Sequence, residues 1–104
     1  MITAFVTIKL PRELTREKWL ENITNIAPRF QGVPGLARKN FIFNRDTGLG
    51  GGVYTWESRE IAEKFYAGQW RENMIKMFGV EPRIEYFESP VIVDNVTGKI
   101  ELTG

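Results

Sequence analysis

A single lysine, Lys39, interrupts a stretch in which alternate positions hold the apolar residues Ala37, Phe41 and Phe43. An ammonium beside an apolar pocket can hold an anionic phenolate, enolate or carboxylate. The alternative is a lysine whose stem lies along a sheet while its ammonium reaches water. The two interpretations differ in whether a cavity lies beside the amine, and the residue pattern alone leaves both open.

Aromatic and thioether side chains are dense between residues 54 and 78. They comprise Tyr54, Trp56, Phe65, Tyr66, Trp70, Met74 and Phe78. Core packing explains most residues of this kind. However, aromatic residues make up 12% of the chain, and several carry polar groups, so some of them could line a pocket for a flat apolar ligand.

Several chemistries are excluded because the chain has no histidine and no cysteine. It lacks the commonest general base, the commonest transition-metal ligand, the usual haem ligand and any thiolate. The acidic residues are scattered without ligand spacing, so no metal site is predicted. The glycines between Gly48 and Gly52 lie between two strands, which indicates a hairpin or a close backbone approach and not a phosphate loop.

The length of 104 residues points to one domain over residues 1–104. A net charge of +1, with both signs interspersed, argues against nucleic acid as partner. No segment approaches the roughly 20 apolar residues that span a bilayer. The alternating start of the chain resembles a strand and not a signal peptide, so we expect a cytoplasmic protein.

The elements that position these residues follow from two periodicities. Period two predicts four strands, at about residues 2–10, 36–44, 51–56 and 82–88. Helical spacing predicts helices after the N-caps Thr15 and Ser58, the second interrupted at Gly68. The order β-α-β-β-α-β is that of an α+β ferredoxin-like fold, with both helical units on one face of a four-stranded antiparallel sheet. Residues 90–104 are expected to form an extended tail.

Both faces of this predicted sheet carry bulky side chains. Neighbouring residues of a strand point to opposite faces, and both members of the pair Val53 and Tyr54 are bulky. The same is true of Ile42 and its neighbours Phe41 and Phe43. The face without helices would expose more apolar surface than monomers tolerate. We therefore expect a homodimer in which two such sheets pack together.

Particular segments carry a resemblance to a known family. They are Val33-Pro34-Gly35-Leu36, Lys39, the run from Gly51 to Arg59, Gly79-Val80-Glu81-Pro82, and Ile84-Glu85-Tyr86-Phe87. With these segments, nearly the whole chain resembles the YdhR-like monooxygenases of the dimeric α+β barrel superfamily. The resemblance implies a homodimer with an apolar pocket between the helices and the sheet of each subunit. Monooxygenases of that superfamily oxidise aromatic substrates with molecular oxygen and without metal or flavin.

We therefore expect a cofactor-independent monooxygenase of a small aromatic or quinol-like compound. Lys39 would stabilise the substrate anion, and Tyr54 would hydrogen-bond to the substrate or accept its proton. The expected substrate-binding residues are Asn40, Phe41, Trp56, Trp70, Met74 and Phe78. The alternatives are a non-catalytic dimeric module for a small apolar ligand, an isomerase or cyclase using the same pocket, and a structural dimer with a filled core.

Overall fold

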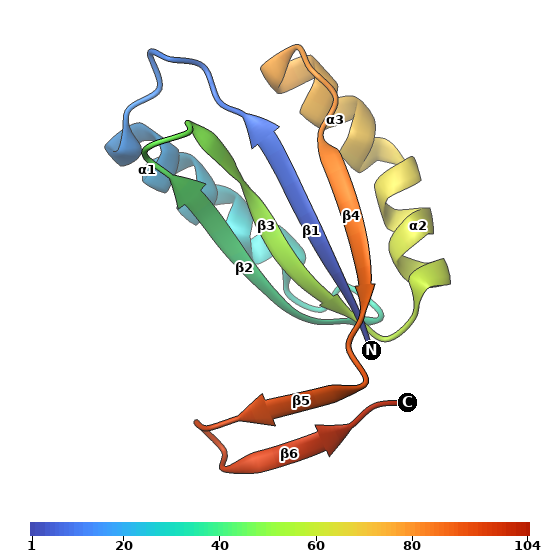
Figure 1. The fold of residues 1–104 in the computed structure, drawn as a ribbon. Coiled ribbons are helices and arrows are strands. Elements are labelled where there is room, and N and C mark those ends of the chain that lie inside the picture. The colour runs from blue at the N-terminus through green and yellow to red at the C-terminus, as the bar shows by residue number, and fades with distance from the viewer.

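The structure, a computed structural model, describes residues 1–104 and consists of a four-stranded antiparallel sheet with the helices on one face (Figure 1). The elements are β1 Ile2–Lys9, α1 Arg16–Ile26, the 3-10 helix η1 Ala27–Phe30, β2 Leu36–Asn44, β3 Leu49–Trp56, α2 Arg59–Ala67, α3 Gln69–Phe78, β4 Arg83–Glu88, β5 Val91–Asp94 and β6 Lys99–Leu102. The sheet order β2-β3-β1-β4 confirms the predicted ferredoxin-like fold. No helix is long and apolar enough to cross a bilayer.

Side-chain caps set the helix boundaries that the sequence predicted. Thr15 Oγ1 accepts a hydrogen bond from the backbone N–H of Lys18 at 3.1 Å, and Ser58 Oγ accepts one from that of Ile61 at 3.2 Å. Each bond satisfies a donor that the first turn of a helix would leave without a partner. Gly68 separates α2 from α3, and Gly79 ends α3 in the left-handed conformation.

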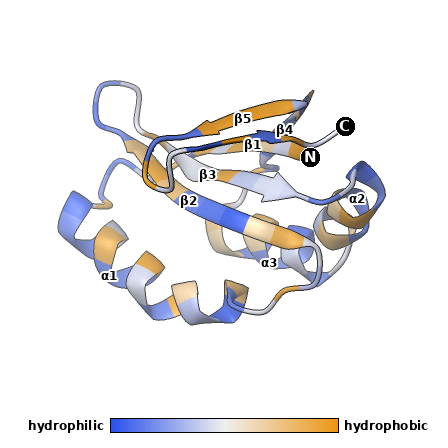
Figure 2. Ribbon diagram, turned by 90° about the horizontal axis from the view of Figure 1, so that it is seen from below, coloured by the Kyte–Doolittle hydropathy of each residue, from blue (hydrophilic) through white to orange (hydrophobic).

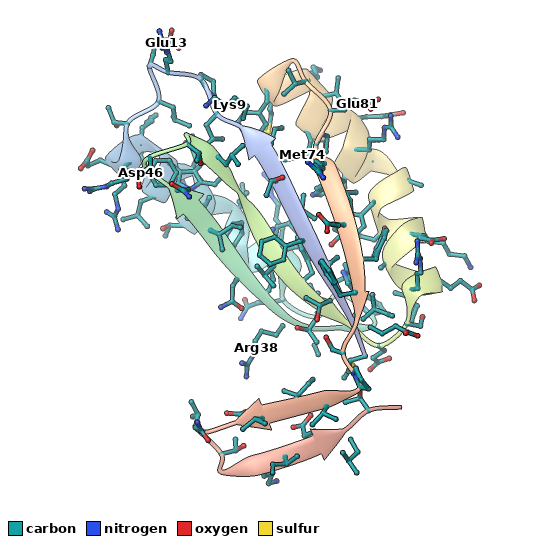
Figure 3. The ribbon with its side chains drawn as sticks, viewed as in Figure 1. Lys9, Glu13, Arg38, Asp46, Met74 and Glu81 are labelled. Atoms are coloured by element: carbon teal, nitrogen blue, oxygen red, sulfur yellow. The ribbon has the colours of Figure 1, made fainter.

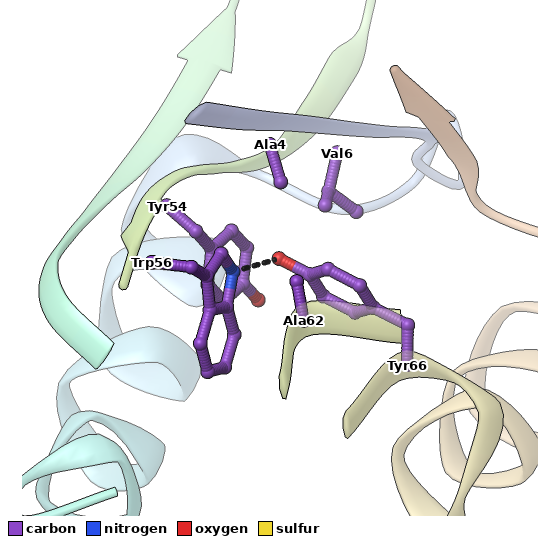
Figure 4. Close-up of a cluster of buried hydrophobic side chains, with 6 residues drawn as sticks. All are labelled: Ala4, Val6, Tyr54, Trp56, Ala62 and Tyr66. Atoms are coloured by element: carbon purple, nitrogen blue, oxygen red, sulfur yellow. Dashed lines mark hydrogen bonds between the residues drawn. The ribbon is translucent and has the colours of Figure 1, made fainter. Parts of the chain in front are cut away.

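The core lies between the sheet and α2 (Figure 4). Alternate residues of β1, including Ala4 and Val6, face inward and are buried. Trp56 Nε1 donates a hydrogen bond to Tyr66 Oη at 3.0 Å, which pairs two polar groups inside an apolar cluster. The ring of Tyr54 stacks on Trp56 with centroids 5.9 Å apart.

Strand β2 departs from the predicted alternation at its start. The register shifts between Leu36 and Arg38, so Ala37 has no partner across the ladder. Leu36 takes the inner position and packs on the core, while Ala37 is exposed. The expectation that Ala37 shares the inner face is therefore wrong, although Lys39 lies on that face, directly opposite Tyr54.

Residues 91–102 form a hairpin, β5–β6, on the side of the sheet opposite the helices (Figure 2). Its base is fixed by the N-terminal amine of Met1, which donates to Thr103 Oγ1 at 2.8 Å. Its first strand approaches the main sheet, where Arg38 Nη2 lies 3.9 Å from Asp94 Oδ2 (Figure 3). The predicted tail is thus an ordered two-stranded ribbon.

Candidate functional site

A cavity of about 500 Å³ lies between the inner face of the sheet and the helices. Ten of its 16 lining residues are hydrophobic. They come from β1, β2, β3, α1, η1, α2 and α3, so the cavity depends on the whole helical layer. This arrangement rules out the alternative of a completely filled core.

The floor of the cavity is the glycine run of β3. A Cβ at Gly52 would lie 3.1 Å from Lys39 Cε and 3.0 Å from Tyr54 Cε1. A Cβ at Gly51 would lie 1.9 Å from the carbonyl oxygen of Val6, and Gly51 has a φ of 148° that other residues rarely adopt. The close backbone approach predicted for this run is confirmed, and it leaves room for the lysine stem.

Lys39 stands among aromatic faces. Its Nζ lies 3.3 Å from the ring centroid of Phe30, 3.9 Å from that of Phe41 and 4.6 Å from that of Tyr54. Burial alone lowers the pKa of Lys39 to about 7, because no carboxylate compensates the desolvated ammonium. The amine and ammonium forms are therefore both populated near neutral pH.

Tyr54 lines the cavity beside this amine. Burial raises the pKa of the Tyr54 hydroxyl, and a hydrogen bond from Trp70 offsets part of the effect. Burial likewise raises the pKa of Tyr66 in the adjoining core. Both phenols therefore stay protonated at neutral pH, and the Tyr54 hydroxyl can donate a hydrogen bond.

The charged groups of the lining are all basic. Besides Lys39 they are Arg29 on η1 and Lys76 on α3, both exposed, and no aspartate or glutamate lines the cavity. No three acidic side chains gather anywhere in the chain to form a metal site. The electrostatics of the cavity favour an anion.

Five of the eight residues predicted for the site line this cavity. They are Lys39, Phe41, Tyr54, Trp70 and Met74.

The other three lie elsewhere. Asn40 faces the opposite side of the sheet, because neighbouring residues of a strand point to opposite faces. Trp56 is 0% exposed behind Tyr54, and Phe78 packs against a second core cluster around Trp19. None of these three side chains lines the cavity.

Sequence analysis did not identify several lining residues. Asn73 and Met77 share a helical face with Trp70 and Met74, so the spacing 70, 73, 74 and 77 could have revealed them. Arg29, in contrast, gave no signal, because a basic residue in an exposed turn is usually solvated surface.

Comparisons with known proteins agree with the fold. Residues 5–89 match the family model described as "Putative mono-oxygenase ydhR". A putative antibiotic biosynthesis monooxygenase from Deinococcus radiodurans is similar with a TM-score of 0.68 and 12% identity, covering 90% of this chain and 97% of that one. The monooxygenase from the gene ActVA-Orf6 of Streptomyces coelicolor, solved in complex with nanaomycin D, gives a TM-score of 0.62 and 17% identity, covering 85% and 86%. At these identities the structural likeness shows the fold alone, and no curated protein matches the sequence.

Proposed function

Since this chain belongs to the ydhR family of mono-oxygenases, we propose that its cavity binds a small aromatic or quinol-like compound and oxygenates it. The observation that carries the proposal is the amine of Lys39, which stands in an apolar cavity without an acidic partner. Such an amine can remove a proton from a bound substrate, and the ammonium that results faces the substrate anion.

Lys39 and Tyr54 take different parts in this scheme. A base works best when its pKa lies near the working pH, and the pKa of Lys39 is about 7. Tyr54, whose pKa is raised by burial, donates a hydrogen bond to the oxygen on which negative charge develops. We therefore assign proton removal to Lys39 alone.

The reaction needs no resident cofactor if the substrate supplies the electrons. A substrate CH₂ group loses a proton to Lys39, and the carbanion passes one electron to O₂. The radical pair combines to form a C–O bond, giving a peroxide. Cleavage of its O–O bond, with loss of the second C–H proton, leaves a carbonyl on the substrate and releases the other oxygen atom as water.

Oxygen uptake with anthrone-type substrates, which carry such a CH₂ group, tests this proposal in metal-free buffer. We expect uptake with wild type, a loss of at least about tenfold in Lys39→Met because the base is removed, and no change in Lys64→Met, an exposed lysine on α2. Absence of uptake across a broad panel, or equal rates in wild type and Lys39→Met, would overturn it. Thermal stabilisation by the same compounds without uptake would instead indicate a non-catalytic binding module, and proton exchange without uptake an isomerase.

The active assembly is proposed to be a homodimer. The sheet face without helices exposes Phe5 by 42% and Phe87 by 48%, with Val53 directly opposite Phe5. One face of the β5–β6 hairpin adds four exposed apolar residues, Val91, Val93, Ile100 and Leu102. An isolated two-stranded hairpin is marginal in water, so a second copy covering both surfaces would stabilise it.

Analytical ultracentrifugation tests the dimer. Wild type should sediment as a dimer. Phe5→Glu should sediment as a monomer, because an unpaired carboxylate would be buried in the interface. Thr24→Glu, an exposed change on the helical side, serves as the control. A monomeric wild type at micromolar concentration would refute this part.

A further inference from the structure

We infer that the ligand of the cavity is an aromatic carboxylate whose ring system lies beside Lys39 and whose carboxylate lies at the open side, held by Arg29 and Lys76. This inference rests on the proposed function, because it assumes that the same cavity is the substrate site. It goes further in naming a charged substituent that the chemistry at Lys39 does not require.

The first support is the segregation of charge. The chain carries 14 basic and 13 acidic side chains, yet the cavity has three basic lining residues and no acidic one. The adjoining hollow, which shares Trp19 and Phe41 with the cavity, adds Arg16 and Arg45 and again no acidic residue. The two hollows together are thus lined by five basic residues and no acidic one, in a nearly neutral protein.

The second support is that these cations have no partners within the chain. The six ion pairs of the protein use Lys18, Arg38, Arg59, Lys64, Arg71 and Arg83. None of the basic residues around the two hollows takes part in an ion pair. Their charge is therefore available to a ligand.

The third support is the division of the cavity into a dry part and a wet part. Lys39 is desolvated among aromatic rings, whereas Arg29 and Lys76 line the same cavity and are exposed to water. Asn73 lies one helical turn before Lys76 on α3 and also lines the cavity, which adds a neutral hydrogen-bonding group. An apolar ring with a carboxylate at one end matches this polarity, since charged groups keep part of their hydration at the mouth.

A matched ligand pair tests the inference without requiring turnover. We would measure dissociation constants of anthraquinone-2-carboxylate and anthraquinone-2-carboxamide from the quenching of Trp19 and Trp70 fluorescence, since both residues line the cavity. Wild type should bind the carboxylate at least about tenfold more tightly than the carboxamide at low salt, and the preference should shrink as salt screens the rim charges.

The double variant Arg29→Gln, Lys76→Gln should lose this preference, whereas the matched control Arg71→Gln, Lys64→Gln, which lies outside the cavity lining, should keep it. Circular dichroism would confirm that each variant is folded. Equal affinity for the two ligands in wild type, a preference that survives the double variant, or no binding of either ligand would overturn the inference. Oxygen uptake with uncharged anthrones would still support the proposed function in those cases, so the two failures are distinguishable.

Discussion

Replacing Lys39 with methionine should stabilise the fold at neutral and acidic pH, although it removes the proposed base. Burial lowers the pKa of Lys39 from 10.5 to about 7. The unfolded chain therefore binds this proton more tightly than the folded chain does. The free energy of unfolding rises with pH between about 7 and 10.5, and below pH 7 the contribution of this group no longer changes with pH. A pKa difference of about 3.5, at 1.36 kcal/mol per unit, means that the buried ammonium opposes folding by about 5 kcal/mol below pH 7.

The neighbouring rings reduce this cost. The faces of Phe30, Phe41 and Tyr54 share one ammonium and together attract it by about 1–3 kcal/mol. We therefore expect Lys39→Met to raise the free energy of unfolding by about 2–4 kcal/mol at pH 6, and the gain to approach zero at about pH 10.5.

Urea denaturation at pH 6, 8 and 10 measures this difference, at one protein concentration because the stability of a dimer depends on it. Lys64→Met on α2 is the matched control, and its effect should be small at every pH because its side chain is exposed. A Lys39→Met protein that is less stable than wild type at pH 6 would refute the reasoning. A gain that stays constant up to pH 10 would do so too.

Three further outcomes follow from the same geometry. Oxygen uptake should increase about tenfold from pH 6 to pH 8, as the amine form of Lys39 becomes dominant, and a flat pH profile would contradict its role as base. Trp56→Phe should lower the free energy of unfolding by about 1–3 kcal/mol in thermal or urea unfolding, because it leaves Tyr66 Oη without its partner. Trp19→Phe should lower it less, since the indole N–H of Trp19 is buried without a partner. Gly51→Ala should lower the melting temperature by several degrees or prevent folding, because its Cβ would meet a backbone carbonyl of β1 at 1.9 Å; an unchanged melting temperature would contradict the close approach.

The fold could be predicted because its elements obey local rules. The alternation in β1, the caps at Thr15 and Ser58 and the break at Gly68 each depend on residues within a few positions of one another. The bulge at Ala37 could not be predicted, because the alternation of a strand does not reveal where its partner skips a residue. The homodimer and the cytoplasmic location stay predictions.

The site was predicted less completely, for two different reasons. Trp56 and Trp70 belong to the same aromatic set, yet only the packing of α2 on β3 buries the first and leaves the second at the cavity. The assignment of Asn40 to the site could have been avoided, because the residue next to Lys39 on a strand must point to the opposite face of the sheet. The cations Arg29 and Lys76 come from segments far apart in sequence, and only the tertiary structure brings both to one cavity.

The glycines at the floor of the cavity determine where the amine of Lys39 can lie. Gly51 and Gly52 present a strip of main chain whose N–H and C=O groups face sideways into the sheet. Because Gly52 has no Cβ, the stem of Lys39 and the ring of Tyr54 can both lie against this strip. An alanine at position 52 would crowd Lys39 Cε at 3.1 Å and Tyr54 Cε1 at 3.0 Å, so it would displace the amine as well as narrow the cavity.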